Sequence, residues 1–319
     1  MQKIRAAVIG VGYLGRFHAQ KYAQAEGCEL LAVVDPRAAA REQVAAELKV
    51  ASLEDHRSLL GGVDAVSVAT PTPAHFAIAR DFLQAGAHVL VEKPITETPA
   101  EARALIALAA RVGRTLQVGH LERFNAAILA AEPYLKSPNF VECHRLAPYR
   151  ERGTDVNVVL DLMIHDIDIV QTIVGAPIAA IDAVGTPVFS EEIDIANARI
   201  RFANGCVANA TASRVSVKTE RKLRIFEDDT YLSLDLQQKI MTLIRRRAPG
   251  DAPGPLPVTI EELSLEPGDA LKAEIDSFLD CIRTGRAPVV SGEAGLIALE
   301  TAIRITEQVN RSLAARRAR

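Results

Sequence analysis

The feature that most constrains this chain is a glycine-rich turn close to its N-terminus. An apolar segment over residues 4–9 runs directly into Gly10-Val11-Gly12-Tyr13-Leu14-Gly15, a G-x-G-x-x-G pattern. We expect a first strand that turns here into a first helix. Gly10 would permit the tight turn, Gly12 would let the backbone approach a pyrophosphate, and Gly15 would let the helix pack on the strand. The helix start, with Tyr13 and Leu14, would then face the anion of a dinucleotide. The alternative is a glycine turn in an α/β core that binds nothing.

An acidic residue at the end of the second apolar segment supports the dinucleotide interpretation. Leu30-Leu31-Ala32-Val33-Val34 is followed by Asp35, about 20 positions beyond the glycines. Its carboxylate can accept hydrogen bonds from both hydroxyls of an adenosine ribose and would repel a 2′-phosphate. The pattern therefore favours NAD over NADP. Arg37 could soften that preference, so NADP stays open as an alternative.

Composition narrows the class of protein. The 319 residues suggest two domains, and 49% hydrophobic with 24% charged residues is ordinary for a globular protein. A net charge of −3 gives no reason to expect nucleic acid or a membrane surface as a partner. The first strand leaves no room for a signal peptide, and no apolar run reaches membrane-spanning length, so we expect a cytoplasmic protein. The four cysteines lie far apart, without a zinc spacing, and no metal site is expected from them.

The first part of the chain, residues 1–120, alternates short apolar strands with helices and predicts a Rossmann-type dinucleotide-binding domain. Two helix starts lie just beyond strand ends: Thr72-Pro73 reads as a cap followed by proline, and Thr98-Pro99-Ala100-Glu101 as a capping box. The expected strands, with a weaker one near Val50, are Ile4–Ile9, Leu30–Val34, Ala65–Ala69, His88–Val91 and Thr115–Val118.

Residues 121–319 change to longer strands with period-two alternation. We expect a substrate-binding α+β domain with an open antiparallel sheet, through which the chain would form a homodimer or homotetramer, because one uncovered face would expose an apolar surface. Asn204-Gly205 marks a hairpin, residues 248–257 read as an exposed loop, and the last of two closing helices, 270–284 and 293–313, could pack back on the first domain. The remaining expected strands are Phe140–Leu146, Ile178–Gly185, Ala196–Phe202, Cys206–Thr211, Lys222–Glu227, Thr230–Asp235 and Lys239–Ile244.

Lys93 stands at the end of the fifth strand, in Val91-Glu92-Lys93-Pro94. Proline turns the chain away and would present the lysine at the carboxyl edge of the sheet, where such sheets bind ligands. An ammonium there can hydrogen-bond a substrate hydroxyl and steady a developing alkoxide. The alternative is an ordinary surface lysine.

A second stretch that could take part in the chemistry is Asp161 to Thr172. At 100° per residue, Asp161, His165, Asp168 and Thr172 share one narrow stripe of an otherwise apolar helix. Burying such a stripe requires partners, which favours a ligand or a hydrogen-bond network. Two alternatives are a core histidine satisfied by its own i−4 aspartate and a zinc pair, the latter without a third ligand nearby.

Taken together, the glycine fingerprint, Thr70-Pro71 followed by His75, Glu92-Lys93-Pro94 and Asp161-x-x-x-His165 resemble the Gfo/Idh/MocA family over nearly the whole chain. The resemblance implies an NAD(P)-dependent sugar or cyclitol dehydrogenase. Lys93 would orient the reacting hydroxyl, His165 would act as general base in oxidation, and Asp161 would hold substrate or tune His165. It also implies that Thr70, Pro71 and His75 line the cofactor, with Glu92 near its ribose or nicotinamide.

One string narrows the expected substrate. Gly119-His120-Leu121-Glu122-Arg123-Phe124-Asn125 is similar to a subgroup of nucleotide-sugar 3-dehydrogenases, including those that act on UDP-N-acetylglucosamine. Arg123 and Asn125 would meet polar groups of the substrate, or else serve only the loop-to-helix structure and an interdomain ion pair. Tyr149, in Tyr149-Arg150-Glu151-Arg152, would belong to a flap that meets a diphosphate, or to a solvated charged loop.

The leading hypothesis is therefore metal-free, reversible hydride transfer between a sugar carbinol carbon and nicotinamide. Two rivals remain: a dinucleotide-sensing regulator without catalysis, and a reductase or dehydrogenase of a cyclitol or another non-nucleotide substrate.

Overall fold

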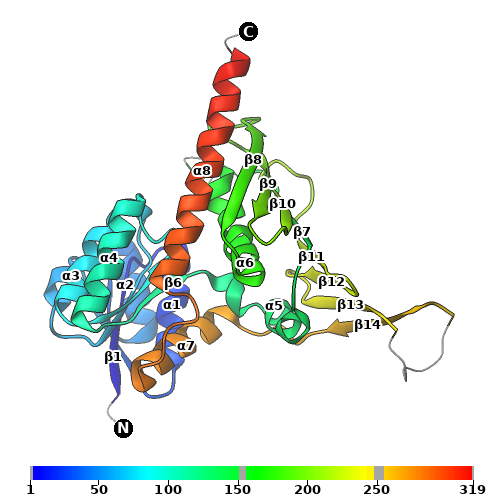
Figure 1. Ribbon diagram of the computed structural model, residues 1–319. Coiled ribbons are helices and arrows are strands. Elements are labelled where there is room, and N and C mark those ends of the chain that lie inside the picture. The colour runs from blue at the N-terminus through cyan, green and yellow to red at the C-terminus, as the bar shows by residue number, and fades with distance from the viewer. Residues whose placement is uncertain (1–2, 151–155, 248–254, 318–319) are drawn as a thin grey trace. The chain divides into compact units, whose positions relative to one another are not determined.

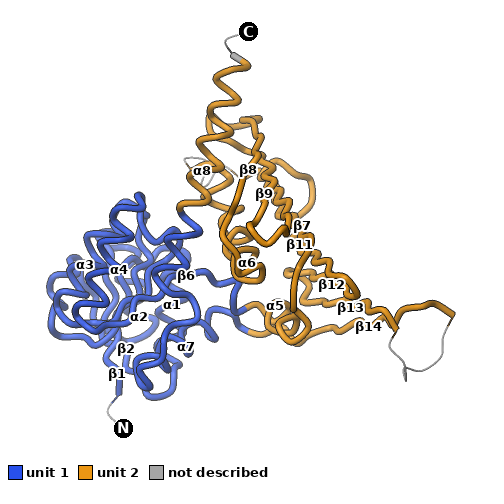
Figure 2. Tube along the Cα trace, in the orientation of Figure 1, with its two compact units in different colours: residues 1–124, 269–299 blue, residues 125–268, 300–319 orange. Residues whose placement is uncertain are grey.

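The computed structural model describes residues 3–150, 156–247 and 255–317, which form two compact units (Figures 1 and 2). Unit 1 comprises residues 1–124 and 269–299, and unit 2 comprises residues 125–268 and 300–319. Unit 1 thus extends past the expected boundary at residue 120 and also takes in a segment from the end of the chain. None of the helices in the described ranges combines the length and apolarity needed to cross a membrane.

Unit 1 is built on a six-stranded parallel sheet in the order β3-β2-β1-β4-β5-β6. The order reverses direction between β1 and β4, which is the crevice where open α/β sheets bind ligands. The strands are β1 Ile4–Ile9, β2 Cys28–Val34, β3 Ala51–Leu53, β4 Ala65–Val68, β5 His88–Glu92 and β6 Leu116–Gly119. Every strand expected from the apolar segments is present, within two residues at each end.

Helices cover both faces of this sheet. Buried residues of α1, α2 and α7 form one core with β1 and β2, while α3 and α4 pack on each other (Figure 1). Right-handed crossovers send the helices on the two sides of the β1/β4 switch to opposite faces. The bounds are α1 Tyr13–Gln24, α2 Ala38–Leu48, α3 His75–Gln84, α4 Pro99–Val112 and α7 Ala270–Thr284.

The two predicted helix starts have different outcomes. Thr98 and Glu101 form the expected capping box at the start of α4. The predicted cap at Thr72 is wrong: Thr72–Ala74 is a 3-10 helix without a side-chain cap, and α3 begins only at His75.

Unit 2 contains an eight-stranded sheet in the order β14-β13-β12-β11-β7-β10-β9-β8. The expectation of a purely antiparallel sheet needs correction, because β10 pairs with β7 in parallel, and side-chain alternation carries no information about strand direction. The strands are β7 Phe140–Leu146, β8 Ile178–Thr186, β9 Ile195–Phe202, β10 Val207–Ser213, β11 Glu220–Phe226, β12 Thr230–Asp235, β13 Ile240–Arg246 and β14 Val258–Ser264. Strand β14 was not expected: it is an edge strand with little burial, so core packing left no clear pattern in its sequence. Residues 248–254 of the predicted loop lie outside the described residues.

Three helices complete unit 2: α5 Ala126–Ala131, α6 Ile164–Val174 and the C-terminal portion of α8. Helix α6 packs on β7 and β10, at the centre of the sheet. Helix α8 spans Gly292–Arg317, and its first residues, to Leu299, belong to unit 1.

The outer face of the central strands is polar, so the predicted apolar sheet surface is wrong for this region. Asn197 donates to Thr211 at 2.8 Å across β9 and β10, and Arg224 pairs with Glu142 at 2.7 Å across β11 and β7. Toward one end of these strands, the Phe226 ring lies 4.8 Å from that of Tyr231. Cross-strand pairs of polar side chains satisfy this face without requiring that it be covered.

Candidate functional site

The glycine turn has the backbone geometry that its sequence predicts. Gly10 has φ +83°, and a Cβ there would lie 2.7 Å from the carbonyl oxygen of Ala69. A Cβ on Gly15 would lie 1.8 Å from the carbonyl oxygen of Gly10, so only glycine fits both positions. Helix α1 begins after Gly12 and has no side-chain cap. An uncapped helix start directs backbone N–H groups outward and suits an anion such as a pyrophosphate.

The two residues after Gly12 differ in exposure. The Tyr13 side chain is exposed and packs edge-on against Phe17, with ring centroids 5.3 Å apart. Leu14 is half-buried in the same first turn. Both remain predicted, not demonstrated, neighbours of the cofactor.

Asp35 follows β2 and lies directly beneath the glycine turn. Its carboxylate accepts a hydrogen bond from Val11 N at 3.1 Å. It also accepts two from the Arg37 guanidinium, whose Nε and Nη2 each lie 3.0 Å from one carboxylate oxygen. Burial opposes ionisation of Asp35, but the bonds from Arg37 and Val11 outweigh it and keep the pKa of this carboxyl below its ordinary value. The Arg37 side chain is exposed and reaches Gly12, where a Cβ would lie 3.4 Å from Nη2. An acid and a cation therefore sit together where the adenosine ribose is expected.

His75 connects the loops that follow β4 and β5. Its Nδ1 lies 2.9 Å from the carbonyl oxygen of Pro94, and its Nε2 lies 2.8 Å from that of Thr70. The side chain is 1% exposed, and burial lowers its pKa. The predicted role of lining the cofactor is thus better described as holding the two loops together. Pro71 is exposed at the start of the 3-10 helix, and Thr70 Oγ1 is buried without a hydrogen-bond partner among the described residues, which suits contact with a ligand hydroxyl.

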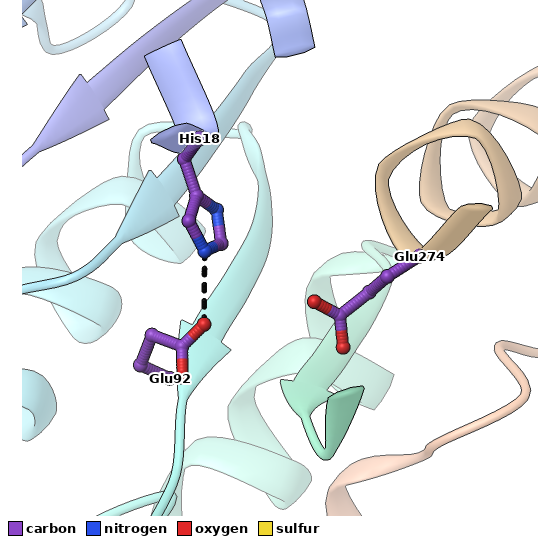
Figure 3. Close-up of side chains that lie close together, drawn as sticks. All are labelled: His18, Glu92 and Glu274. Carbon is purple, nitrogen blue, oxygen red and sulfur yellow. Dashed lines mark hydrogen bonds and ion pairs between the residues drawn. The ribbon is translucent and has the colours of Figure 1, made fainter. Parts of the chain in front are cut away.

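Glu92 faces the interior. Its Oε1 lies 2.9 Å from His18 Nε2 on α1, and Figure 3 shows the two side chains pointing toward one another. Burial opposes ionisation, but the bond from His18 outweighs it and keeps the pKa of Glu92 below its ordinary value. This geometry does not support the predicted contact between Glu92 and the ribose or nicotinamide. His18 was missed from the sequence, although its place one turn after Gly15 directs it to the sheet side of α1.

Lys93 immediately follows β5, at the carboxyl edge of the sheet. Its side chain is half-exposed, its backbone N–H donates to Glu92 Oε2 at 3.3 Å, and the Lys93–Pro94 peptide bond is cis. The position agrees with the general location of ligand sites in such sheets. The role of its ammonium in the reaction remains a proposal.

In unit 2, the segment with Asp161 and His165 is not one regular helix. Residues Val159–Met163 form a π-helix, whose Val159 N–H donates to Asn157 Oδ1 at 3.1 Å, and α6 begins at Ile164. The 100° rule therefore does not extend to Asp161, whereas His165, Asp168 and Thr172 lie within α6. Asp161 and His165 are half-buried, Asp168 is buried and Thr172 is exposed. Single π-turns often mark functional sites because they re-aim side chains.

An ion pair that the sequence did not suggest fixes α6 to the sheet. Asp166 is 4% exposed and Arg145 on β7 is 3% exposed, with Arg145 Nη2 at 2.8 Å and Nε at 3.0 Å from the carboxylate oxygens. Two parallel bonds define the orientation of both groups. The pair sets the rotation of the helix that carries His165.

The remaining predicted substrate residues have different environments. Asn125 is buried; its Oδ1 caps α5 through Ala127 N, and its Nδ2 donates to the Leu236 carbonyl. Asn125 therefore has a structural role, and we leave it out of the site proposed below. Arg123 is half-buried on the 3-10 helix Leu121–Phe124.

Tyr149, which the sequence predicted as a substrate residue, forms an exposed aromatic pair with Phe189, which it did not. Its ring lies 5.4 Å from that of Phe189 in an edge-on arrangement. Asp194 holds the Phe189 loop by accepting bonds from Val188, Phe189 and Ser190 backbone N–H groups. Residues 151 and 152 of the predicted flap lie outside the described residues.

Within the described part of the chain, Asp161 and His165 are not members of a group of three potential metal ligands. Among the residues that the structure describes, the grouping of acid and imidazole side chains close enough to share an ion is His18, Glu92 and Glu274, whose ligand atoms lie within 4.8 Å of one another.

Comparison with known proteins agrees with this architecture. Residues 4–120 match the Gfo/Idh/MocA oxidoreductase family, NAD-binding Rossmann fold, and residues 145–313 match the C-terminal α/β domain of that family. The chain is 41% identical to the UDP-N-acetylglucosamine 3-dehydrogenase of Acidithiobacillus ferrooxidans over 96% of this chain and 97% of that protein. A solved structure of that enzyme superimposes with a TM-score of 0.91 at 41% identity, covering 97% of this chain and 98% of the other.

More distant relatives act on cyclitols. The scyllo-inositol 2-dehydrogenase (NAD(+)) of Bacillus subtilis is 27% identical over 95% of this chain and 93% of its own length. The Lactobacillus casei scyllo-inositol dehydrogenase, solved with NAD(H), shares the fold with a TM-score of 0.80 at 19% identity, over 98% of both chains. The glycine turn, the uncapped start of α1 and the Asp35–Arg37 pair fit NAD. The chain is a member of the Gfo/Idh/MocA family of NAD-binding oxidoreductases and is an NAD-dependent dehydrogenase of CH–OH groups.

Proposed function

We propose that this enzyme oxidises the C3 hydroxyl of UDP-N-acetylglucosamine to the 3-keto sugar, with NAD as the hydride acceptor. The observation that carries the proposal is the 41% identity to the 3-dehydrogenase across nearly the whole of both chains. Identity to the inositol dehydrogenase is 27% over a similar length. The Gly119–Asn125 string, which resembles nucleotide-sugar dehydrogenases, supports the same substrate.

In the proposed reaction, the C3–H bond breaks and its electron pair leaves as hydride, while the C3 oxygen loses its proton and forms a carbonyl. NAD supplies the two-electron acceptor when bound. His165 takes the hydroxyl proton, since an imidazole titrates near neutral pH and can return the proton in the reverse direction. Lys93 donates a hydrogen bond to the reacting oxygen and stabilises its developing negative charge. Asp161, one turn before His165, orients the imidazole or holds a sugar hydroxyl.

Two further groups are assigned to the substrate. The guanidinium of Arg123 binds the phosphates of the nucleotide, since guanidinium groups suit phosphates. The base stacks on the rings of Tyr149 and its neighbour Phe189, since aromatic rings suit a base. The expected homodimer or homotetramer through the unit 2 sheet and the cytoplasmic location stay predictions.

A substrate panel tests the proposal. Formation of NADH is followed with UDP-N-acetylglucosamine, UDP-glucose, free N-acetylglucosamine, and myo- and scyllo-inositol. The proposal expects the first compound to have the highest kcat/KM. Faster turnover of an inositol would support the cyclitol alternative, and tight NAD binding without turnover of any compound would support the regulator.

A further inference from the structure

A buried polar cluster lies inside unit 1, on the α1 and α7 side of the sheet. His18 comes from α1, Glu92 from the end of β5 and Glu274 from α7 (Figure 3). His18 and Glu274 are 0% exposed, and Glu92 is 8% exposed. Two carboxyl groups in one such interior cannot both ionise without a large cost, because each charge lacks solvent and repels the other.

Glu92 has partners for an ionised carboxylate. A chain of hydrogen bonds reaches it from Tyr22: the hydroxyl lies 3.0 Å from Ser67 Oγ, which lies 3.1 Å from His18 Nδ1, and His18 Nε2 lies 2.9 Å from Glu92 Oε1. The chain is satisfied in one direction if each group donates to the next. The other oxygen, Oε2, accepts the backbone N–H of Lys93.

Glu274 has the opposite environment. Neither of its carboxyl oxygens has a hydrogen-bond partner among the described residues, although Figure 3 shows the group directed toward Glu92. Burial, and next the charge of Glu92, raise the pKa of Glu274 well above its ordinary value. The titratable groups around the cluster are His18 and Tyr22 on α1, Cys28 on β2, Glu92 at the end of β5, and Lys93 directly after it.

A proton suits this cluster better than a metal ion. His18 Nε2 and Glu92 Oε1 lie 2.9 Å apart, which is the separation of a hydrogen bond. Two ligand atoms each about 2.0–2.2 Å from a tetrahedral zinc ion would lie roughly 3.3–3.6 Å apart. One proton on Glu274 removes the repulsion between the two acids and leaves the bond from His18 intact.

Glu92 is also fixed sterically. A Cβ on Gly119 would lie 2.8 Å from Glu92 Oε1, so the carboxylate fits in a slot that only glycine leaves open. Movement of Glu92 would disturb the backbone N–H of Lys93, to which it is bonded.

We infer that Glu274 is a neutral carboxylic acid in the folded protein, beside the ionised Glu92 carboxylate, and through Glu92 positions the turn that carries Lys93. The protonation state stands on the cluster alone, whereas the effect on Lys93 rests on the proposed function. Glu274 is a positioning residue and contacts no substrate in this account.

Infrared spectroscopy of the ligand-free enzyme tests the protonation state without activity. Protein labelled with ¹³C-glutamate should show the carbonyl stretch of a protonated carboxylic acid at neutral pH. The band should disappear in Glu274→Gln and persist in the matched surface variant Glu293→Gln. Absence of the band in the unmodified enzyme at neutral pH would overturn the inference, and this readout does not depend on the folding of any variant. Stoichiometric bound metal that is lost in Glu274→Gln would also overturn it.

Kinetics test the positioning role. Glu274→Gln imitates the neutral acid and should retain kcat within about threefold, whereas Glu274→Ala should lower kcat by about tenfold or more with little change in KM for NAD. A kcat that is retained in Glu274→Gln but lost in Glu274→Ala supports the positioning role. An equal loss of kcat in both variants, with the band still present in the unmodified enzyme, would overturn the positioning role but not the protonation state. If no substrate is turned over, the infrared band still decides the protonation state.

Discussion

The Arg37 guanidinium donates hydrogen bonds to both oxygens of the Asp35 carboxylate, with Nε 3.0 Å from Oδ1 and Nη2 3.0 Å from Oδ2. Backbone N–H groups of Arg37 and Val11 complete the set at 2.9 and 3.1 Å. A carboxylate offers about four acceptor positions, so all are in use within the protein. A ribose hydroxyl that bonds Asp35 must therefore displace the arginine, whose exposed side chain is able to move.

Cofactor choice follows from this pair. Arg37→Ala removes the cation that offsets the Asp35 charge, and we expect KM for NADP to rise by about tenfold while KM for NAD changes much less, since a bond to a charged group contributes about 1.5–3 kcal/mol. The measurement is initial rates with each cofactor. Arg57→Ala, at an exposed arginine, serves as control. An equal change for both cofactors would mean that Arg37 does not discriminate between them.

His165→Ala should lower kcat by about 10²–10⁴-fold, because the base that accepts the hydroxyl proton is lost. Binding of NADH, measured by fluorescence titration, should stay nearly unchanged. The matched control is His144→Ala, a partly exposed histidine on β7 that faces Glu142 and Glu220. Parallel loss of NADH affinity would show that His165 supports cofactor binding, contrary to its proposed role.

The buried pair beneath α6 should be important for stability. Asp166→Ala removes the carboxylate that is bonded to the buried Arg145 guanidinium and should reduce the free energy of unfolding by about 3–5 kcal/mol. Glu142→Ala, which breaks the more exposed pair with Arg224, should cost less than about 1 kcal/mol. Urea denaturation compares the two variants. Similar losses would contradict the importance assigned to burial.

Glu274 gives stability a specific pH dependence. Its folded-state pKa is raised by burial and by Glu92, while the unfolded value is about 4.3. Below the unfolded pKa both states hold the proton, so the contribution is fully present there. As pH rises toward the folded pKa, only the unfolded state releases its proton, and stability falls by about 1.4 kcal/mol per pH unit. Glu274→Gln lacks this loss, so its stability relative to the unmodified enzyme should increase from about pH 5 upward. Unfolding curves at several pH values check this, and a constant difference would refute it.

The parts of the fold that were predicted from sequence are local. The glycine turn, the capping box at Thr98 and the strand bounds depend on neighbouring residues, so their patterns are visible in the chain. Placing Glu92 required knowledge of a tertiary contact, since His18 lies 74 positions away and no spacing rule connects them. The π-turn at Asp161 broke the assumption of a regular helical period.

Burial was the other source of error. Asn125 and Glu92 are polar residues in motifs, which favoured the prediction that they contact a ligand, but both side chains are buried in the protein interior. The outer sheet face was expected to be apolar because no helix was assigned to it. Cross-strand polar pairs such as Asn197 with Thr211 provide another solution. Predictions for Lys93, His165 and Asp161 depend on chemistry that the fold permits and that experiments must establish.

Isotope transfer tests the central claim most directly. The enzyme is incubated with NAD and UDP-N-acetylglucosamine carrying deuterium at C3 of the sugar, and the reduced cofactor is examined by NMR and mass spectrometry. The account predicts one deuterium at C4 of the nicotinamide for each NADH formed, together with a 3-keto sugar nucleotide. NADH without deuterium, or deuterium transfer only from substrate labelled at another carbon, would contradict oxidation at C3.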